Sequence, residues 1–281
     1  MRLPTFLVIG AAKSGTTSLH QYLCQHPDVF LPAVKETNYY WSEAGAHGRR
    51  TPSSLADYAR LFEPAGACRA VGEVSPQYLN SATAAERIRR DLPEVRLVVS
   101  LRNPADRAYS DYLGRVRILR ESRPLDEAVR PGEPCFEWGF YHPRLRRYYA
   151  RFPREQIHVV LHDDYARDTP ATLRGVFGHL GVEPAIPIDT STRHNSAALP
   201  RCNVLNRVLW SSIMATRRLV PAQQRGSGRA ARLLAKTHRL APSCPPALWR
   251  DLQARYHDDI LATAEIIGRD LSAWLLPQGM G

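Results

Sequence analysis

The stretch Thr5–Thr17, TFLVIGAAKSGTT, decides the fold class of this 281-residue chain. Its first six residues form a short apolar run that ends at a glycine, which predicts a buried strand over 5–10. Residues 11–15 then predict a tight loop, and residues 16–25 predict a helix that Pro27 stops. This order of elements is typical of a phosphate site, because the N–H groups and the positive dipole end at the helix start attract an anion.

Strands and helices continue to alternate through the first 199 residues. Further strands are predicted over 28–31, 70–74, 95–101 and 157–161, and helices over 53–62, 81–91, 104–120, 141–152 and 170–180. Such alternation predicts an α/β fold with a central parallel sheet flanked by helices on both faces.

The pattern changes at Pro200. We expect no strand beyond it, but an arginine-rich stretch over 217–239 and a closing amphipathic helix over 248–274. The whole chain, 1–281, is therefore expected to form a single domain. An α/β nucleotide-binding core would span 1–199, and a helical C-terminal flank or lid would span 200–281.

The composition excludes several classes of protein. Hydrophobic residues make up 44% and charged residues 23%, which is typical of a globular chain and excludes a disordered tail, a collagen-like rod or a disulfide-stapled miniprotein. No apolar run approaches the ~20 residues of a membrane span, and the N-terminus lacks a signal-peptide pattern. We therefore expect a soluble, cytoplasmic protein. The five cysteines form no CxxC pair, which indicates buried thiols, with a Cys202–Cys244 disulfide as the alternative.

The basic residues carry a more specific signal. The net charge is +11, which favours a polyanionic partner. Lysine occurs only at Lys13, Lys35 and Lys236, while arginine fills the other 35 basic positions, as codon bias would produce. Two of the three lysines fall within the first 35 residues. A lysine at these positions therefore indicates a need for a compact ammonium group rather than a planar guanidinium.

Two motifs point to a bound nucleotide. The Gly10–Gly15 spacing fits the GxxxxGK[ST] loop of nucleoside triphosphatases, but Lys13 precedes Gly15 and threonine follows it. The second motif, VRLVVSLRNPADRAYSDYL, places Arg102 after a predicted strand and Ser110 two turns into the next helix. Open α/β sheets bind ligands at the carboxyl ends of their strands, where Arg102 is expected to lie. A guanidinium can hold phosphate there through two hydrogen bonds.

With these motifs, the chain resembles the sulfotransferases that use 3′-phosphoadenosine 5′-phosphosulfate (PAPS). LVIGAAKSGTTSLHQYL resembles their 5′-phosphosulfate loop, and the Arg102–Ser110 motif is similar to their second signature. HPDVFLPAVKETNYYW is similar to the carbohydrate type, which includes the heparan sulfate group and bacterial relatives. The resemblance covers nearly the whole chain and implies the P-loop NTPase-like sulfotransferase fold, with PAPS as the donor.

The resemblance also implies residue roles. Arg102 and Ser110 would bind the 3′-phosphate of the donor. The loop residues would bind its 5′-phosphosulfate, and these are Lys13, Ser14, Gly15, Thr16, Thr17 and Ser18. Glu36 matches the catalytic glutamate of the family and would act as general base. Lys13 would contact the leaving phosphate and the transferring group, so no metal is expected.

Several points stay open at this stage. Lys35 would attract the donor, tune Glu36 or be solvated, and His47 is an alternative base because phenol and steroid sulfotransferases use histidine. His194-Asn195 would line the nucleotide site or form a structural pair.

The acceptor is open too. Heparan-type members carry an acidic residue at the position of Trp41 and a lysine at that of Val74, and both help to hold an anionic sugar chain. Tyr39, Tyr40, Trp41 and Tyr78 instead indicate either an aromatic acceptor pocket or ordinary core packing. We expect a saccharide, glycolipid or small-molecule acceptor, modified at a hydroxyl and less readily at an amine. The sequence specifies no oligomeric state.

Two other functions compete with this interpretation. A P-loop-like nucleotide kinase would use the same loop, but the lysine position of the triphosphatases is missing and no aspartate for magnesium is evident on a core strand. A basic nucleic-acid-binding protein would explain the charge, but the chain contains no known binding motif. We therefore expect a small-molecule or saccharide partner and no nucleic acid.

Overall fold

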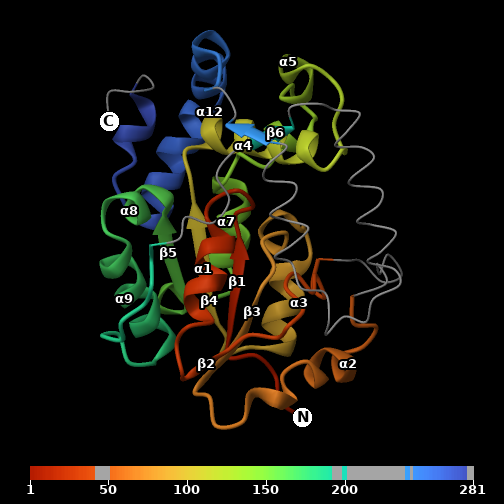
Figure 1. The fold of residues 1–281 in the computed structure, drawn as a ribbon, viewed down its shortest axis with the longest axis vertical. Coiled ribbons are helices and arrows are strands. Elements are labelled where there is room, and N and C mark those ends of the chain that lie inside the picture. Colours follow the sequence, from red (N-terminus) through yellow and green to blue (C-terminus); the bar gives the residue numbers. More distant parts are fainter. Residues whose placement is uncertain (42–50, 192–197, 201–237, 241–242, 277–281) are drawn as a thin grey trace.

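A parallel five-stranded sheet forms the centre of the computed structural model, which describes residues 1–41, 51–191, 198–200, 238–240 and 243–276 (Figure 1). The strands lie in the order β2-β3-β1-β4-β5, and every neighbouring pair is parallel. Their bounds are β1 Phe6–Gly10, β2 Val29–Phe30, β3 Ala70–Val74, β4 Arg96–Leu101 and β5 Ile157–Leu161. The central parallel sheet predicted from the sequence is therefore confirmed.

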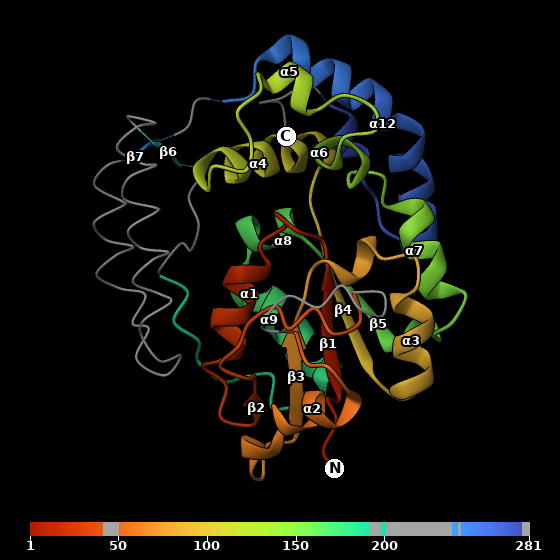
Figure 2. The same cartoon turned by 90° about the vertical axis from the view of Figure 1, so that its right-hand side faces the viewer.

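Helices cover both faces of this sheet (Figure 2). Helices α1 (Thr16–Leu23) and α9 (Thr169–Leu180) lie on one face, and α3 (Ala84–Asp91) and α7 (His142–Tyr149) lie on the other. Successive side chains of β1 point to opposite faces, so Phe6 and Val8 join the core under α1 and α9. Leu7 and Ile9 join the core on the opposite face. Both faces are thus dry, which explains the unbroken apolar run of this strand.

The carboxyl ends of the strands lie under a second set of helices. Helix α4 (Pro104–Arg117) crosses above this edge of the sheet, and α12 (Pro246–Ile267) packs against α4 and α7 (Figure 2). Trp249 on α12 donates a hydrogen bond from its ring N–H to Asp106 at 2.9 Å. Short helices complete this region: α5 Leu125–Ala128, α6 Pro134–Glu137 and α8 His162–Arg167, with α2 Leu55–Arg60 at the other end of the molecule.

The region after residue 199 departs from the prediction in two ways. Strands β6 (Ala198–Pro200) and β7 (His238–Leu240) pair antiparallel, so the expectation that no strand follows Pro200 was wrong. Three-residue strands are too short to show a period-2 pattern. The closing helix ends at Ile267 because Gly268 turns left-handed with a φ of +65°, and a 3₁₀ turn over Ser272–Leu275 follows.

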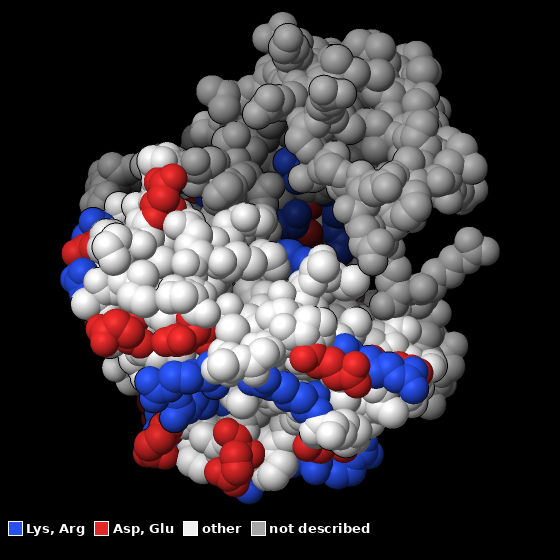
Figure 3. Space-filling model, turned by 60° about the horizontal axis from the view of Figure 1, so that its bottom comes forward, with Lys and Arg blue, Asp and Glu red and all other residues white. Residues whose placement is uncertain are grey.

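Some predictions fall on parts of the chain that the structure does not describe. The described residues leave out most of the arginine-rich stretch. They also leave out His47, His194, Asn195 and Cys202. Cys244, the other half of the alternative disulfide, is a buried free thiol. Among the described helices, none is long and apolar enough to cross a membrane. The face in Figure 3 carries intermixed acidic and basic side chains, with further charged groups deep in a hollow.

Candidate functional site

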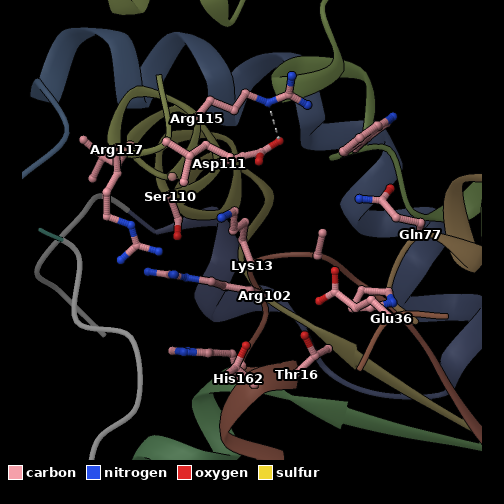
Figure 4. Close-up of a pocket in the computed structure, with 18 of the residues that line it drawn as sticks. Lys13, Thr16, Glu36, Gln77, Arg102, Ser110, Asp111, Arg115, Arg117 and His162 are labelled. Atoms are coloured by element: carbon pink, nitrogen blue, oxygen red, sulfur yellow. Dashed lines mark ion pairs between the residues drawn. The ribbon is translucent and has the colours of Figure 1, made fainter. Parts of the chain in front are cut away.

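Most of the predicted site residues line one cavity of about 400 Å³ at the carboxyl edge of the sheet (Figure 4). They are Lys13, Gly15, Thr16, Thr17, Ser18, Glu36, Arg102 and Ser110. A cavity of this volume suits a small-molecule ligand. Ser14 is the exception, because it is fully buried below the loop, where the Ser100 hydroxyl donates to its carbonyl group. The structure thus brings together residues from three separate stretches of the sequence.

The loop between β1 and α1 presents the start of a helix to this cavity. Gly15 precedes α1 with a φ of +88°, a left-handed conformation that glycine adopts without steric cost. Glycine has no side chain to cap the helix, and the first turn of α1 contains no acidic residue. The first N–H groups of a helix lack partners within the helix and carry the positive end of its dipole. This end of α1 can therefore hold an anionic group.

Lys13 extends across the cavity to helix α4. A Cβ atom built on Gly114 would lie 3.0 Å from Lys13 Cε and still closer to Nζ, so the lysine packs against the bare backbone of that glycine. Burial lowers the pKa of Lys13, and the Asp111 carboxylate opposes this shift most strongly. Arg117 lowers the pKa further by charge repulsion. The ammonium group is thus largely stripped of water, which strengthens its attraction for a negative charge.

The side chains of Arg102 and Ser110 point toward each other in the cavity, beside Lys13 (Figure 4). Arg102 is the first residue after β4, and the Tyr141 hydroxyl fixes its carbonyl with a hydrogen bond of 2.8 Å. The next residue, Asn103, caps α4 by accepting a hydrogen bond from the N–H of Ala105 at 3.0 Å. The cap sets the start of α4, so Ser110 lies two turns along it, facing the same space as Arg102.

Glu36 lies on the segment that follows β2, across the cavity from Arg102. Its backbone is left-handed, with a φ of +60°, and its side chain is 44% exposed. Lys35 Nζ lies 2.6 Å from Glu36 Oε1 and also donates to the Thr17 hydroxyl at 3.4 Å. Lys35 therefore contacts both Glu36, the predicted base, and Thr17 at the start of α1. These contacts favour the two roles of attracting the donor and tuning Glu36 over that of a solvated lysine.

Helix α4 contributes further residues that the sequence did not single out. Arg117 and Gly114 lie on the Ser110 side of the helix, at spacings of seven and four residues. Arg115 stacks over the ring of Trp138, 5.2 Å from its centroid, and lies 3.5 Å from the carboxylate of Asp111. Helical periodicity counted onward from Ser110 could have found the first two residues. No sequence signal connects Arg115 with Trp138.

His162 and Gln77 complete the wall of the cavity. His162 is the first residue after β5, and a Cβ on Gly15 would lie 3.5 Å from its ring. Burial lowers the pKa of His162, and Arg102 adds to this shift, so the ring stays neutral near pH 7. The rule that ligands bind at the carboxyl ends of parallel strands could have identified His162.

Of the four residues in the aromatic cluster, the three tyrosines pack in the core. Tyr39, Tyr40 and Tyr78 are at most 7% exposed, while Trp41 is 45% exposed. The ring of Tyr39 stacks on that of Tyr58, with centroids 4.6 Å apart. None of these tyrosines lines the described cavity, so the structure favours the core-packing alternative. Within the described ranges, no group of three or more His, Cys, Asp or Glu residues is arranged to hold a metal ion.

Comparison with known proteins assigns the chain to a family. The family model described as "Sulfotransferase family" matches residues 4–185 of the sequence. A sulfotransferase from Alicyclobacillus acidocaldarius has the same fold with a TM-score of 0.73 and 28% identity, over 98% of this chain and 99% of that one.

Two curated relatives cover less of the chain. A membrane-associated sulfotransferase of Dictyostelium discoideum, kil1, is 32% identical over 50% of this chain and 27% of its own length. The bifunctional heparan sulfate N-deacetylase/N-sulfotransferase 2 of Homo sapiens is 27% identical over 65% of this chain and 22% of its own length. The matched region thus spans about a quarter of each of these curated relatives.

Proposed function

Because the chain belongs to the sulfotransferase family, we propose that it transfers a sulfuryl group from PAPS to a hydroxyl group of a carbohydrate, glycolipid or small-molecule acceptor. The observation that carries this proposal is the single cavity in which the phosphate loop, the Arg102–Ser110 pair and Glu36 meet. The heparan sulfate enzymes among the relatives favour a carbohydrate acceptor within this set. An amine acceptor is the second form of the same reaction, and the N-sulfotransferases among the relatives support it.

On the donor side, two groups of residues would hold the two anionic ends of PAPS. The start of α1 and Lys13 would bind the 5′-phosphosulfate, because the positive end of the helix dipole and a desolvated ammonium converge there. Arg102 and Ser110 would bind the 3′-phosphate, with Arg117 adding positive charge from the same helix. Lys13 lies between this pair and Glu36 in Figure 4, where the transferring group would be held.

On the acceptor side, Glu36 would remove the proton from the attacking hydroxyl as its oxygen forms a bond to sulfur. Lys35 contacts Oε1, and the carboxylate turns toward the cavity (Figure 4). Lys13 would stabilise the negative charge that the leaving 5′-phosphate gains when its bond to sulfur breaks. Lys13 would act on the leaving group and Glu36 on the attacking hydroxyl, and together they would hold donor and acceptor in line.

The test is a screen with radiolabelled PAPS and separate panels of saccharides, glycolipids and phenols, each with the native protein and with Glu36→Gln. We expect label to transfer to one class of acceptor, and Glu36→Gln to lower turnover by ~10²–10⁴-fold, the usual value of general-base catalysis. Binding of adenosine 3′,5′-bisphosphate should stay unchanged, because Glu36 lies on the acceptor side. Near-normal turnover in Glu36→Gln together with its loss in His47→Ala would assign the base to His47 instead.

A further inference from the structure

Glu73, on β3, has a buried carboxylate on which four hydroxyl groups converge. The residue is 1% exposed, and each of its oxygens accepts two hydrogen bonds. The donors to Oε1 are Tyr58 at 2.7 Å and Tyr78 at 2.6 Å, and the donors to Oε2 are Thr37 at 2.6 Å and Ser75 at 2.8 Å. Carboxyl oxygens accept hydrogen bonds, so the four hydroxyl donors satisfy Glu73 in a site that would otherwise be costly for a polar group.

The two hydroxyls on Oε2 also hold the backbone next to Glu36. Ser75 Oγ accepts from the N–H of Asn38 at 3.2 Å, and Thr37 Oγ1 accepts from the N–H of Tyr39 at 3.4 Å. A hydroxyl has one proton and two lone pairs. Because each hydroxyl donates its hydrogen bond to Glu73, its lone pairs remain available for the backbone N–H groups. Glu73 therefore sets the direction of both contacts.

The backbone over residues 36–39 needs this support. Glu36 has a φ of +60° and Asn38 a φ of +53°, and residues other than glycine rarely adopt this left-handed conformation. It persists where surrounding contacts impose it. The N–H of Glu36 donates to the Val74 carbonyl at 3.2 Å, so three consecutive residues, 73–75, hold the segment, while Arg87 donates to the Tyr39 carbonyl at 3.2 Å.

We propose that Glu73 is a positioning residue, which holds the segment over 36–39 with its two left-handed residues and thereby directs the Glu36 carboxylate into the cavity. The proposal rests on the proposed role of Glu36 as general base. Glu73 itself does not line the described cavity, so it acts through the segment and not on either substrate. Loss of this arrangement lowers turnover and leaves donor affinity unchanged.

The experiment compares variants that each change one group of this hydrogen-bond network. Thr37→Val and Ser75→Ala remove the hydroxyls that link Glu73 to the segment, and Glu73→Gln replaces the acceptor with a group that also donates. Tyr256→Phe is the matched control, because its buried hydroxyl donates to the Phe136 carbonyl at 2.7 Å, far along the chain from this segment. For each variant, kcat, KM for the acceptor, Kd for adenosine 3′,5′-bisphosphate and Tm are measured.

We expect Thr37→Val, Ser75→Ala and Glu73→Gln to lower kcat by about 10- to 100-fold, the effect of misplacing a reacting group by about 1 Å. The Kd for the bisphosphate stays at the native value. Tyr256→Phe loses a similar amount of Tm but keeps its kcat, which separates positioning from general loss of stability. Should Glu73→Gln fail to fold, the two hydroxyl variants still give the answer.

A second readout separates this inference from the proposed function. In a Glu36→Gln background, Thr37→Val should cause no further loss of turnover, because the base that the segment positions is already gone. Full additivity of the two losses would overturn the role of Glu73. So would native kcat in both Thr37→Val and Ser75→Ala while Glu36→Gln alone is impaired. Native turnover in Glu36→Gln would instead overturn the base assignment, and the positioning role with it.

Discussion

The Arg102 side chain is predicted to bind one specific group, the 3′-phosphate of the donor. Its carbonyl is held by Tyr141, so replacing the side chain leaves the backbone contact intact. Arg102→Ala should remove a charge-assisted phosphate contact of about 1.5–3 kcal/mol, which weakens the Kd for adenosine 3′,5′-bisphosphate by about 10- to 150-fold. Calorimetric titration measures this change. Arg60→Ala, an exposed arginine paired with Asp57, should bind like the native protein, and equal affinity in both variants would remove Arg102 from the site.

Gly114 gives a test of Lys13 that leaves the lysine in place. A methyl group at Gly114 would overlap the Lys13 ammonium, so Gly114→Ala must displace it. We expect kcat to fall by about tenfold or more, because the displaced charge no longer meets the leaving phosphate. Alanine is also a better helix former than glycine by about 1 kcal/mol, so Tm should not fall.

The control for this variant is Gly178→Ala on α9. A Cβ on Gly178 meets no atom within 4 Å, so the substitution adds helix propensity without a new contact. It should keep native turnover and show a similar or higher Tm. Native kcat in Gly114→Ala would mean that the position of Lys13 does not matter to the reaction.

At the scale of elements, the long strands were predictable and the short helices were not. Strands β3 and β5 have the predicted bounds, although each mostly apolar stretch contains a polar residue, Glu73 in β3 and His158 in β5. Helices α5 and α6 have four residues each, too few to show a helical repeat. Ser54, one of two adjacent serines that the sequence offers as a cap for α2, accepts a hydrogen bond from the N–H of Asp57 at 3.1 Å. A cap depends on local chemistry, so the sequence reveals it, whereas a three-residue strand such as β6 depends on its distant partner.

Helix α9 should make the stability of the fold sensitive to acid. Its His179 ring contacts the Leu97 carbonyl of β4 at 3.2 Å and stacks on His158 of β5. Burial lowers the pKa of His179 to about 4, with His158 and Arg96 adding to the shift. Between pH 6.5 and about 4 the unfolded chain therefore binds a proton that the folded chain does not, so stability is lost as the pH falls through this range.

The measurement is Tm as a function of pH for the native protein and for His179→Gln. The glutamine can still donate to the Leu97 carbonyl but does not titrate, so its Tm should fall less steeply below pH 6.5. His257→Gln, which changes an exposed histidine on α12, should follow the native curve. Parallel curves for the native protein and His179→Gln would exclude His179 as a source of acid sensitivity.

Across the whole molecule, the sequence predicted the site by its local motifs and missed what the fold assembles. Lys13, Arg102 and Ser110 each lie in a recognisable stretch, and the parallel sheet brings those stretches to one edge. The cavity wall also contains Asp111, Arg115 and Trp138. They lie there because α4 packs on α6, and no local sequence pattern predicts this packing. The tyrosines near Glu36 were ambiguous because core and binding-site aromatics look alike in a sequence. The single-domain organisation over 1–281 and the cytoplasmic location stay predictions.

The central claim is that the cavity is a site for PAPS, and a pair of titrations on the native protein tests it most directly. Adenosine 3′,5′-bisphosphate and ATP with magnesium are titrated separately by calorimetry, and Tm is followed at saturation. The bisphosphate should bind more tightly and raise Tm by mass action, because Arg102 and Ser110 line the cavity and are the proposed ligands of its 3′-phosphate. ATP with magnesium should have the smaller effect, since the triphosphate lysine position is absent. Stabilisation by ATP with magnesium, and none by the bisphosphate, would contradict the claim.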